Sequence, residues 1–147
     1  IMWAGTVAHN GLLGVGRSED WASHAIEHEL SAMYDLAHGA GLAIVFPAWM
    51  KYVYRQDPER FVQFAVRVFG VEQNFHHPEQ TILEGIRRLE DFFRRIGLPT
   101  TLSDANIPAD RLEDMAEMAT AGDTKRLGSF LPLGQSDVLG IYRLCQG

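Results

Sequence analysis

The sequence predicts an all-α fold in a single multi-helix domain spanning residues 1–147. Apolar residues recur at three- and four-residue spacing along most of the chain, which is the pattern of amphipathic helices. No run of alternating apolar and polar residues is long enough to indicate a β-strand. A length of 147 residues suits one domain with one hydrophobic core, and no repeat or linker divides the chain.

The N-terminal third is the most apolar part of the chain. Residues 1–13 are expected to form a first helix that belongs to the core. Asp20 stands where the cap of the next helix is expected, and we favour this capping role over a role as a metal ligand. The longest uncharged apolar run, residues 39–50, contains Pro47 and has 12 residues. This is fewer than the roughly 20 needed to cross a bilayer, so we predict no membrane span, and no signal peptide is recognisable.

Caps and helix breakers define the helices of the middle region. Asp57 and Pro58 are expected to open a helix that Gly70 closes. The clearest helix covers residues 79–96, where one face is an apolar stripe. The stripe consists of Ile82, Leu83, Ile86, Leu89, Phe92, Phe93 and Ile96. The other face carries three favourable i,i+4 charge pairs: Glu84 with Arg88, Glu90 with Arg94, and Asp91 with Arg95.

Two further helices are predicted near the C-terminus. Pro108 is expected to open a helix that runs to Gly122. An ordered loop follows, and Ser136 or Asp137 is expected to cap the last helix. Cys145 lies in that helix, and we interpret it as a packing residue and not as a nucleophile.

Composition excludes several classes of function. Lys and Arg total 13 against 19 Asp and Glu, so a formal charge of -6 argues against nucleic acid as a partner. The only thiol can form neither an intrachain disulfide nor a thiolate metal cluster, which is compatible with the reducing cytoplasm that we expect. The chain starts at Ile1 without an initiator Met, and we therefore expect it to be part of a longer protein.

Three of the six histidines lie within 15 residues: His24, His28 and His38. On a helix, His24 and His28 would share one face. An unbroken helix would place His38 about 21 Å from His24, whereas ligand nitrogens lie only about 2.0 to 2.2 Å from a metal ion. A shared site therefore requires the chain to reverse between them. Asp35 is suited to cap a second helix that begins near His38, with Gly39 and Gly41 allowing close helix contact.

The spacing alone leaves two interpretations open. The histidines are either hydrogen-bonded core residues or ligands of a divalent metal, and imidazole suits Fe and Zn alike. His28 is followed by Glu29 but not by the second half of an HExxH zinc motif. His76 and His77 are interpreted as surface residues of a loop, and the role of His9 stays open.

The stretch from His24 to Pro47 resembles the H-x3-H-x9-HG signature of the iron-containing, group III alcohol dehydrogenases, and in particular their butanol dehydrogenase branch. In this family the signature is followed by an apolar helix with a proline. Residues 8–14 and 97–108 resemble other parts of the family's helical region. The resemblance covers nearly the whole chain.

The resemblance implies a two-domain enzyme of which this chain is the C-terminal part. Family members have an N-terminal α/β domain that binds NADH or NADPH and a C-terminal helical domain that supplies metal ligands. Residues 1–147 would then be the helical metal-binding domain, incomplete at its N-terminal side, and the nucleotide-binding domain would be absent. His24 and His38 match two of the four ligands of the divalent metal (Fe or Zn). His28 matches a catalytic histidine on the substrate and nicotinamide side.

The same resemblance implies hydride transfer between a small primary alcohol and its aldehyde. The family's other two metal ligands are an Asp and a His that precede the residues present here, so we expect these residues alone to be inactive. A homo-oligomer is compatible with the apolar first residues. The alternative from a different class is a stand-alone helical module for binding or self-association, with the histidines packed in its core.

Overall fold

A computed structural model describes all residues, 1–147, as a helical domain without strands, which confirms the predicted class. The elements are α1 (Met2–His9), η1 (Leu12–Gly14), α2 (Ala22–Tyr34), α3 (His38–Val53), η2 (Tyr54–Gln56), α4 (Pro58–Phe69), α5 (Pro78–Arg95), α6 (Leu112–Ala119) and α7 (Gln135–Leu144). A single isolated bridge, between Leu127 and Leu133, closes the loop before α7. No helix is both long and apolar enough to cross a membrane.

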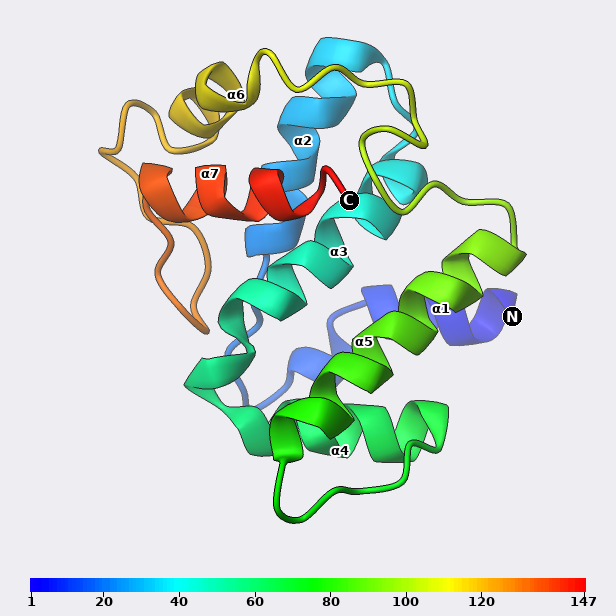
Figure 1. Ribbon diagram of the computed structural model, residues 1–147. Coiled ribbons are helices and arrows are strands. Elements are labelled where there is room, and N and C mark those ends of the chain that lie inside the picture. Colours follow the sequence, from blue (N-terminus) through cyan, green and yellow to red (C-terminus); the bar gives the residue numbers. More distant parts are fainter.

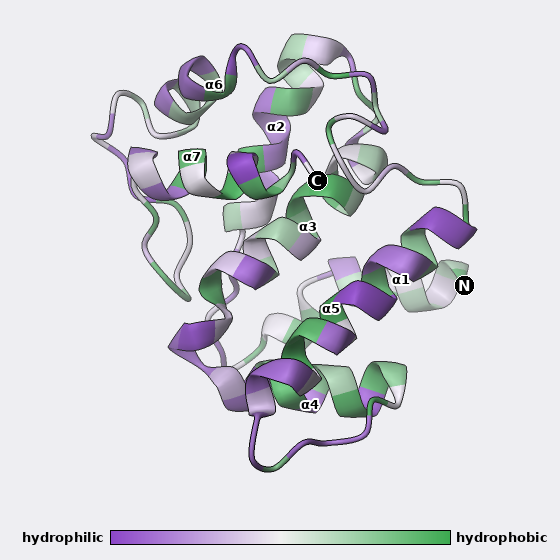
Figure 2. Ribbon diagram, in the orientation of Figure 1, coloured by the Kyte–Doolittle hydropathy of each residue, from purple (hydrophilic) through white to green (hydrophobic).

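Helix α3 runs through the middle of the domain (Figure 1) and packs against α2, α5 and α7. Helices α2, α6 and α7 lie on one side of it, and α4 and α5, which pack on each other, lie on the other (Figure 1). Hydropathy explains why α3 lies in the middle and α5 lies outside it. Helix α3 is apolar over most of its length, whereas α5 carries strongly hydrophilic residues (Figure 2). Burial of these faces forms one core of 25 residues.

The caps and breakers of the middle region are confirmed. The side chain of Asp57 accepts a hydrogen bond from the backbone N–H of Arg60, and Gly70 ends α4 in the left-handed conformation. Helix α5 matches the predicted 79–96 span to within one residue at each end. Close packing of α4 on α5 depends on Gly85, since a Cβ there would lie 2.4 Å from the Cβ of Ala65.

Only one of the three predicted charge pairs on α5 forms, between Glu84 and Arg88 at 2.8 Å. Glu90 faces α3, where it pairs with Lys51 at 2.6 Å. The third expected pair is replaced by two ion pairs of Asp91, with Arg87 and Arg94. A partner on the neighbouring helix thus outcompetes the local one when the side chain points toward the core.

Helix α6 starts later than predicted, at Leu112 and not at Pro108. Ile107 is buried and its N–H donates to the carbonyl of Leu102, which closes a turn before the proline. Residues 109–111 are exposed, so a helical turn there would bury nothing. The helix begins where Leu112 provides the first buried contact, as expected when tertiary packing supplies most of the helix stability.

The prediction that residues 1–13 belong to the core is wrong. Helix α1 has no buried residue, and its apolar side chains Ile1, Met2 and Trp3 are 113%, 89% and 78% exposed. Apolar content alone predicted a helix here correctly, but the remaining residues of this chain offer the segment no surface to pack on. The last helix begins earlier than predicted: its N-cap is Gly134, and Ser136 and Asp137 lie inside it. Asp137 still stabilises the start of the helix, because its carboxylate accepts from the N–H of Gly134 at 2.8 Å.

Candidate metal centre

The reversal of the chain that a shared histidine site requires is present. Helix α2 ends at Asp35, which adopts the left-handed conformation (φ 52°), and α3 begins at His38. The ring centroids of His24 and His38 lie 5.4 Å apart, and those of His28 and His38 lie 5.3 Å apart. Asp35 does not cap α3 as expected. It ends α2 instead, because a short polar side chain tolerates the left-handed conformation better than most residues.

The three imidazoles lie at the surface and not in the core. His28 and His38 are exposed, and His24 is partly buried beneath them. The ring of Trp21 packs edge-on against His24 with centroids 4.7 Å apart. The interpretation as packed core histidines therefore does not describe this cluster.

His24 is held in the form that can bind a metal. Burial lowers its pKa, and the charges of the nearby His38 and His28 lower it further. Its Nδ1 is buried and has no hydrogen-bond partner in the chain. Buried polar atoms are nearly always paired, so this nitrogen is an unsatisfied group within the cluster.

Glu27 is a member of the cluster that sequence reasoning missed. Its side chain is 0% exposed, and its carboxylate accepts hydrogen bonds from the Nδ1 of His38 and the hydroxyl of Ser31. The signal in the sequence was a charged residue between the buried positions Ile26 and Leu30. A charge within an apolar helix face requires a partner, but sequence could not show that this partner is His38.

The donor chemistry of the cluster fits a divalent metal. One ligand atom from each of Glu27, His28 and His38 lies within 4.8 Å of the others, and the imidazole of His24 adjoins them. Imidazole nitrogen binds Fe and Zn in proteins. The two Glu27 oxygens already accept hydrogen bonds, so the three histidines are the available ligands. Three is the lower limit of the three or four protein ligands that a catalytic metal normally has.

Asp20 is not part of the cluster. One of its oxygens accepts from the N–H of Ala22 at 2.9 Å, which confirms the predicted cap of α2. The other accepts from the N–H groups of Ser129 and Phe130 at 2.7 and 2.8 Å, so it also anchors the loop before α7.

The remaining sequence candidates lie elsewhere. His76 and His77 are exposed in a loop, as predicted. His9 is exposed, and its ring lies 6.3 Å from that of Trp21. Cys145 is buried, as predicted for a packing residue, and burial raises its pKa to about 12.

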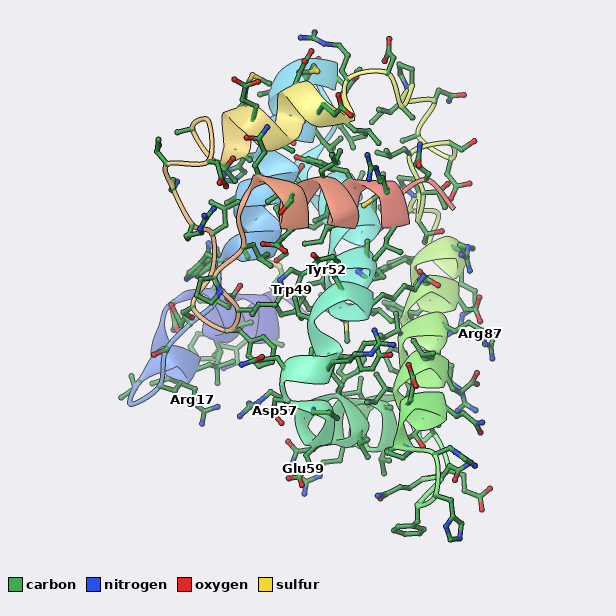
Figure 3. The ribbon with its side chains drawn as sticks, turned by 60° about the vertical axis from the view of Figure 1, so that its left-hand side comes forward. Arg17, Trp49, Tyr52, Asp57, Glu59 and Arg87 are labelled. Carbon is green, nitrogen blue, oxygen red and sulfur yellow. The ribbon has the colours of Figure 1, made fainter.

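A separate hollow of about 710 Å³ lies beside the C-terminal half of α3 and contains none of the histidines. Its aromatic lining includes Trp49, and its polar lining includes Arg17 and Asp57, all labelled in Figure 3. The aromatic rings in it pack on one another, with Trp49 and Phe130 at 6.0 Å and Phe61 and Phe130 at 6.0 Å. The hollow is thus the outer edge of a packed aromatic cluster.

Comparison with known proteins places the whole chain in one group. Residues 1–145 match the family model of the C-terminal part of the Fe-containing alcohol dehydrogenases. A probable NADH-dependent butanol dehydrogenase from Bacillus subtilis is 43% identical over 97% of this chain. The crystal structure of an NADH-dependent butanol dehydrogenase A from Thermotoga maritima superposes on 99% of the chain with a TM-score of 0.89 and 42% identity. The E. coli aldehyde reductase YqhD superposes on 99% with a TM-score of 0.92 and 31% identity.

The matches extend over only part of each relative. The chain spans 36% of the B. subtilis protein and 38% of each of the two crystallised chains.

Proposed function

The chain belongs to the Fe-containing alcohol dehydrogenase family, and on this basis we propose that it supplies half of a catalytic metal site. His24 and His38 are the proposed ligands of a divalent metal, Fe or Zn, and His28 is the proposed catalytic residue. The reaction is the interconversion of a small alcohol and its aldehyde with NADH or NADPH, in line with the names of its relatives. Residues 1–147 are the proposed metal-binding domain, and the cofactor binds mainly to an α/β domain outside them.

The observation that carries the proposal is the convergence of three imidazoles from two helices. The ring of His38 lies 5.4 Å from that of His24 and 5.3 Å from that of His28, although His38 follows His24 by 14 residues. Three neighbouring imidazoles repel one another when protonated, and this repulsion adds to the larger effect of burial in lowering the pKa of His24. A bound cation gives the neutral rings a common partner.

In the reaction, a metal ion bound here supplies Lewis-acid polarisation of the substrate oxygen. His24 contributes a ring that stays neutral near neutral pH, which ligation requires. His28 is exposed, forms no hydrogen bond to the rest of the chain and lies beside His38. Its imidazole is therefore free to take or return the proton of an alcohol hydroxyl, and histidine is the residue that most often performs such proton transfers in enzymes.

The activity of the longer enzyme can be tested by transplantation. Residues 1–147 would replace the matching C-terminal part of the B. subtilis butanol dehydrogenase, with which they share 43% identity. We expect the chimera to oxidise NADH or NADPH with butyraldehyde when Fe or Zn is present, and residues 1–147 alone to show no turnover. Full-rate turnover by residues 1–147 alone, or a folded, NADH-binding chimera without activity, would contradict the proposal.

Variants of the chimera separate the proposed roles. His24→Ala and His38→Ala should abolish both metal retention and turnover. His28→Ala should lower turnover and leave the metal content unchanged. His76→Ala, a substitution in an exposed loop, serves as the matched control and should change neither quantity.

The alternative of a stand-alone module loses its main support, because the histidines are not packed in the core. Self-association stays part of the proposal, since the apolar side chains of α1 are exposed. A location in the cytoplasm is likewise proposed, from the single free thiol.

A further inference from the structure

We infer that Glu27 is a positioning residue that fixes the tautomer and orientation of His38 so that its Nε2 faces the metal. This inference rests on the proposed function, because it presupposes that His38 is a ligand. Glu27 contacts His38 through one carboxylate oxygen and Ser31 through the other.

The first step of the argument is the direction of the hydrogen bond. A carboxylate oxygen acts as the acceptor toward an imidazole N–H, so the contact assigns the ring proton of His38 to Nδ1, which donates to Glu27. The Nε2 then carries the lone pair that is available to a metal. Metal-binding histidines in proteins almost always donate their other ring nitrogen to a carboxylate, a carbonyl or water, and Glu27 fulfils that role here.

The second step concerns the cost of burying Glu27. Its side chain is 0% exposed, whereas that of His38 is 46% exposed. A fully buried carboxylate is unfavourable unless it is paired and hydrogen-bonded. Its partners are the ring of His38 and the hydroxyl of Ser31, which also lies 2.9 Å from the carbonyl oxygen of Leu36 at the helix reversal. Glu27 is thus tied both to the ligand and to the turn that delivers it.

The third step is that α3 makes room for this carboxylate. Gly41 lies one turn after His38, and a Cβ on it would come within 2.2 Å of the Oε1 of Glu27. Gly39 lies two residues earlier in the same helix, and a Cβ there would meet nothing within 4 Å. The absence of a side chain at position 41 is therefore matched to the presence of Glu27.

Long-range 1H–15N correlation spectra of the metal-free chain test the tautomer directly, at a pH where the imidazoles are neutral. A His38→Gln variant assigns the His38 signals. We expect the proton of His38 on Nδ1 in the unmodified chain and a shift toward the Nε2–H tautomer in Glu27→Ala. A proton on Nε2 in the unmodified chain would overturn the inference without any variant being needed.

Zinc affinity, measured by competition with a chromophoric chelator, tests the consequence for binding. Loss of a residue that supports a ligand costs about 10- to 100-fold in metal affinity. We expect Glu27→Ala to show such a loss and Glu27→Gln, whose carbonyl can still accept from Nδ1, to lose less. Glu29→Gln removes the same charge from the same helix two residues away and should leave affinity unchanged. Equal affinity in Glu27→Ala and the unmodified chain would overturn the inference.

Substitutions in α3 test the same contact from the other side. Gly41→Ala should displace Glu27 and lower zinc affinity, whereas Gly39→Ala should not. When Glu27 is already alanine, Gly41→Ala should cause no additional loss, because the clashing atoms are gone. If Gly41→Ala lowers zinc affinity by the same factor with and without Glu27→Ala, the proposed contact between Gly41 and Glu27 is refuted.

The tautomer measurement keeps this inference separate from the proposed function. If zinc binds with an affinity that His24→Ala and His38→Ala leave unchanged, the proposed metal site fails whatever the tautomer. If those two variants lose zinc while the His38 proton sits on Nε2, the metal site stands and the role of Glu27 fails.

Discussion

Replacing Gly85 by alanine tests how closely α4 and α5 must approach. The new Cβ would lie 2.4 Å from the Cβ and 2.8 Å from the Cα of Ala65, whereas ordinary contacts begin at 3.4 Å. The helices would have to separate by about 1 Å, and no side-chain rotation can relieve a clash with a backbone atom. Alanine gains about 1 kcal/mol over glycine in a helix, but overpacking costs about 1 to 3 kcal/mol.

Because the clash includes a backbone atom, the overpacking cost lies at the upper end, about 3 kcal/mol, and we expect Gly85→Ala to lower the free energy of unfolding by about 2 kcal/mol. For a domain of this size, that corresponds to a drop in Tm of about 6 °C. Urea denaturation followed by circular dichroism measures the change. Adding Ala65→Gly removes the methyl group on the other side and should recover part of the loss. A Gly85→Ala protein as stable as its parent would refute the close packing.

Three further substitutions give separate tests. Tyr142 is fully buried and donates to the carbonyl of Ile26 at 2.6 Å, so Tyr142→Phe should cost about 1 kcal/mol in urea denaturation; an unchanged midpoint would contradict the bond. Burial and the hydrogen bond to Asp137 raise the pKa of Tyr52 to about 12, which favours the neutral phenol in the folded state. Its contribution to stability is complete below pH 10 and is lost as the pH rises toward 12, so Tyr52→Phe should flatten that part of the stability profile, and an identical profile would count against it. Asp57→Ala removes the cap of α4 and should cost about 1 kcal/mol in the same assay; no loss would mean that the cap contributes nothing.

The sequence predicted the end of a helix correctly where a single capping or helix-breaking residue determines that end. Asp57 and Gly70 bound α4 because their preferences act through their own backbone and nearest neighbours. The start of α6 was predicted wrongly because it depends on which residues find a buried surface, and Pro108 does not determine that. Asp35 shows the same limit, since a short acidic residue can either begin a helix or end one.

The histidine cluster was predicted in two steps: the spacing showed what a shared site would require, and the family resemblance favoured a shared site over packed core histidines. A spacing of 14 residues is incompatible with one ion unless the chain reverses, and the reversal is present. Glu27 was not predictable in the same way, since its partner His38 lies 11 residues away on another helix. The space that Gly41 leaves for the Glu27 side chain exists only because α2 packs against α3, which the sequence does not show.

The central claim is that His24 and His38 bind one divalent ion together, and zinc titration of the purified 147-residue chain tests it most directly. We predict that His24→Ala and His38→Ala each weaken binding at least tenfold, the loss expected for a direct ligand being no smaller than that for a supporting residue. We also predict that the double variant loses less affinity than the product of the two single losses, because either substitution alone already disrupts the shared site. His76→Ala should bind as the parent chain does. Unchanged zinc affinity in either single variant would contradict the shared site.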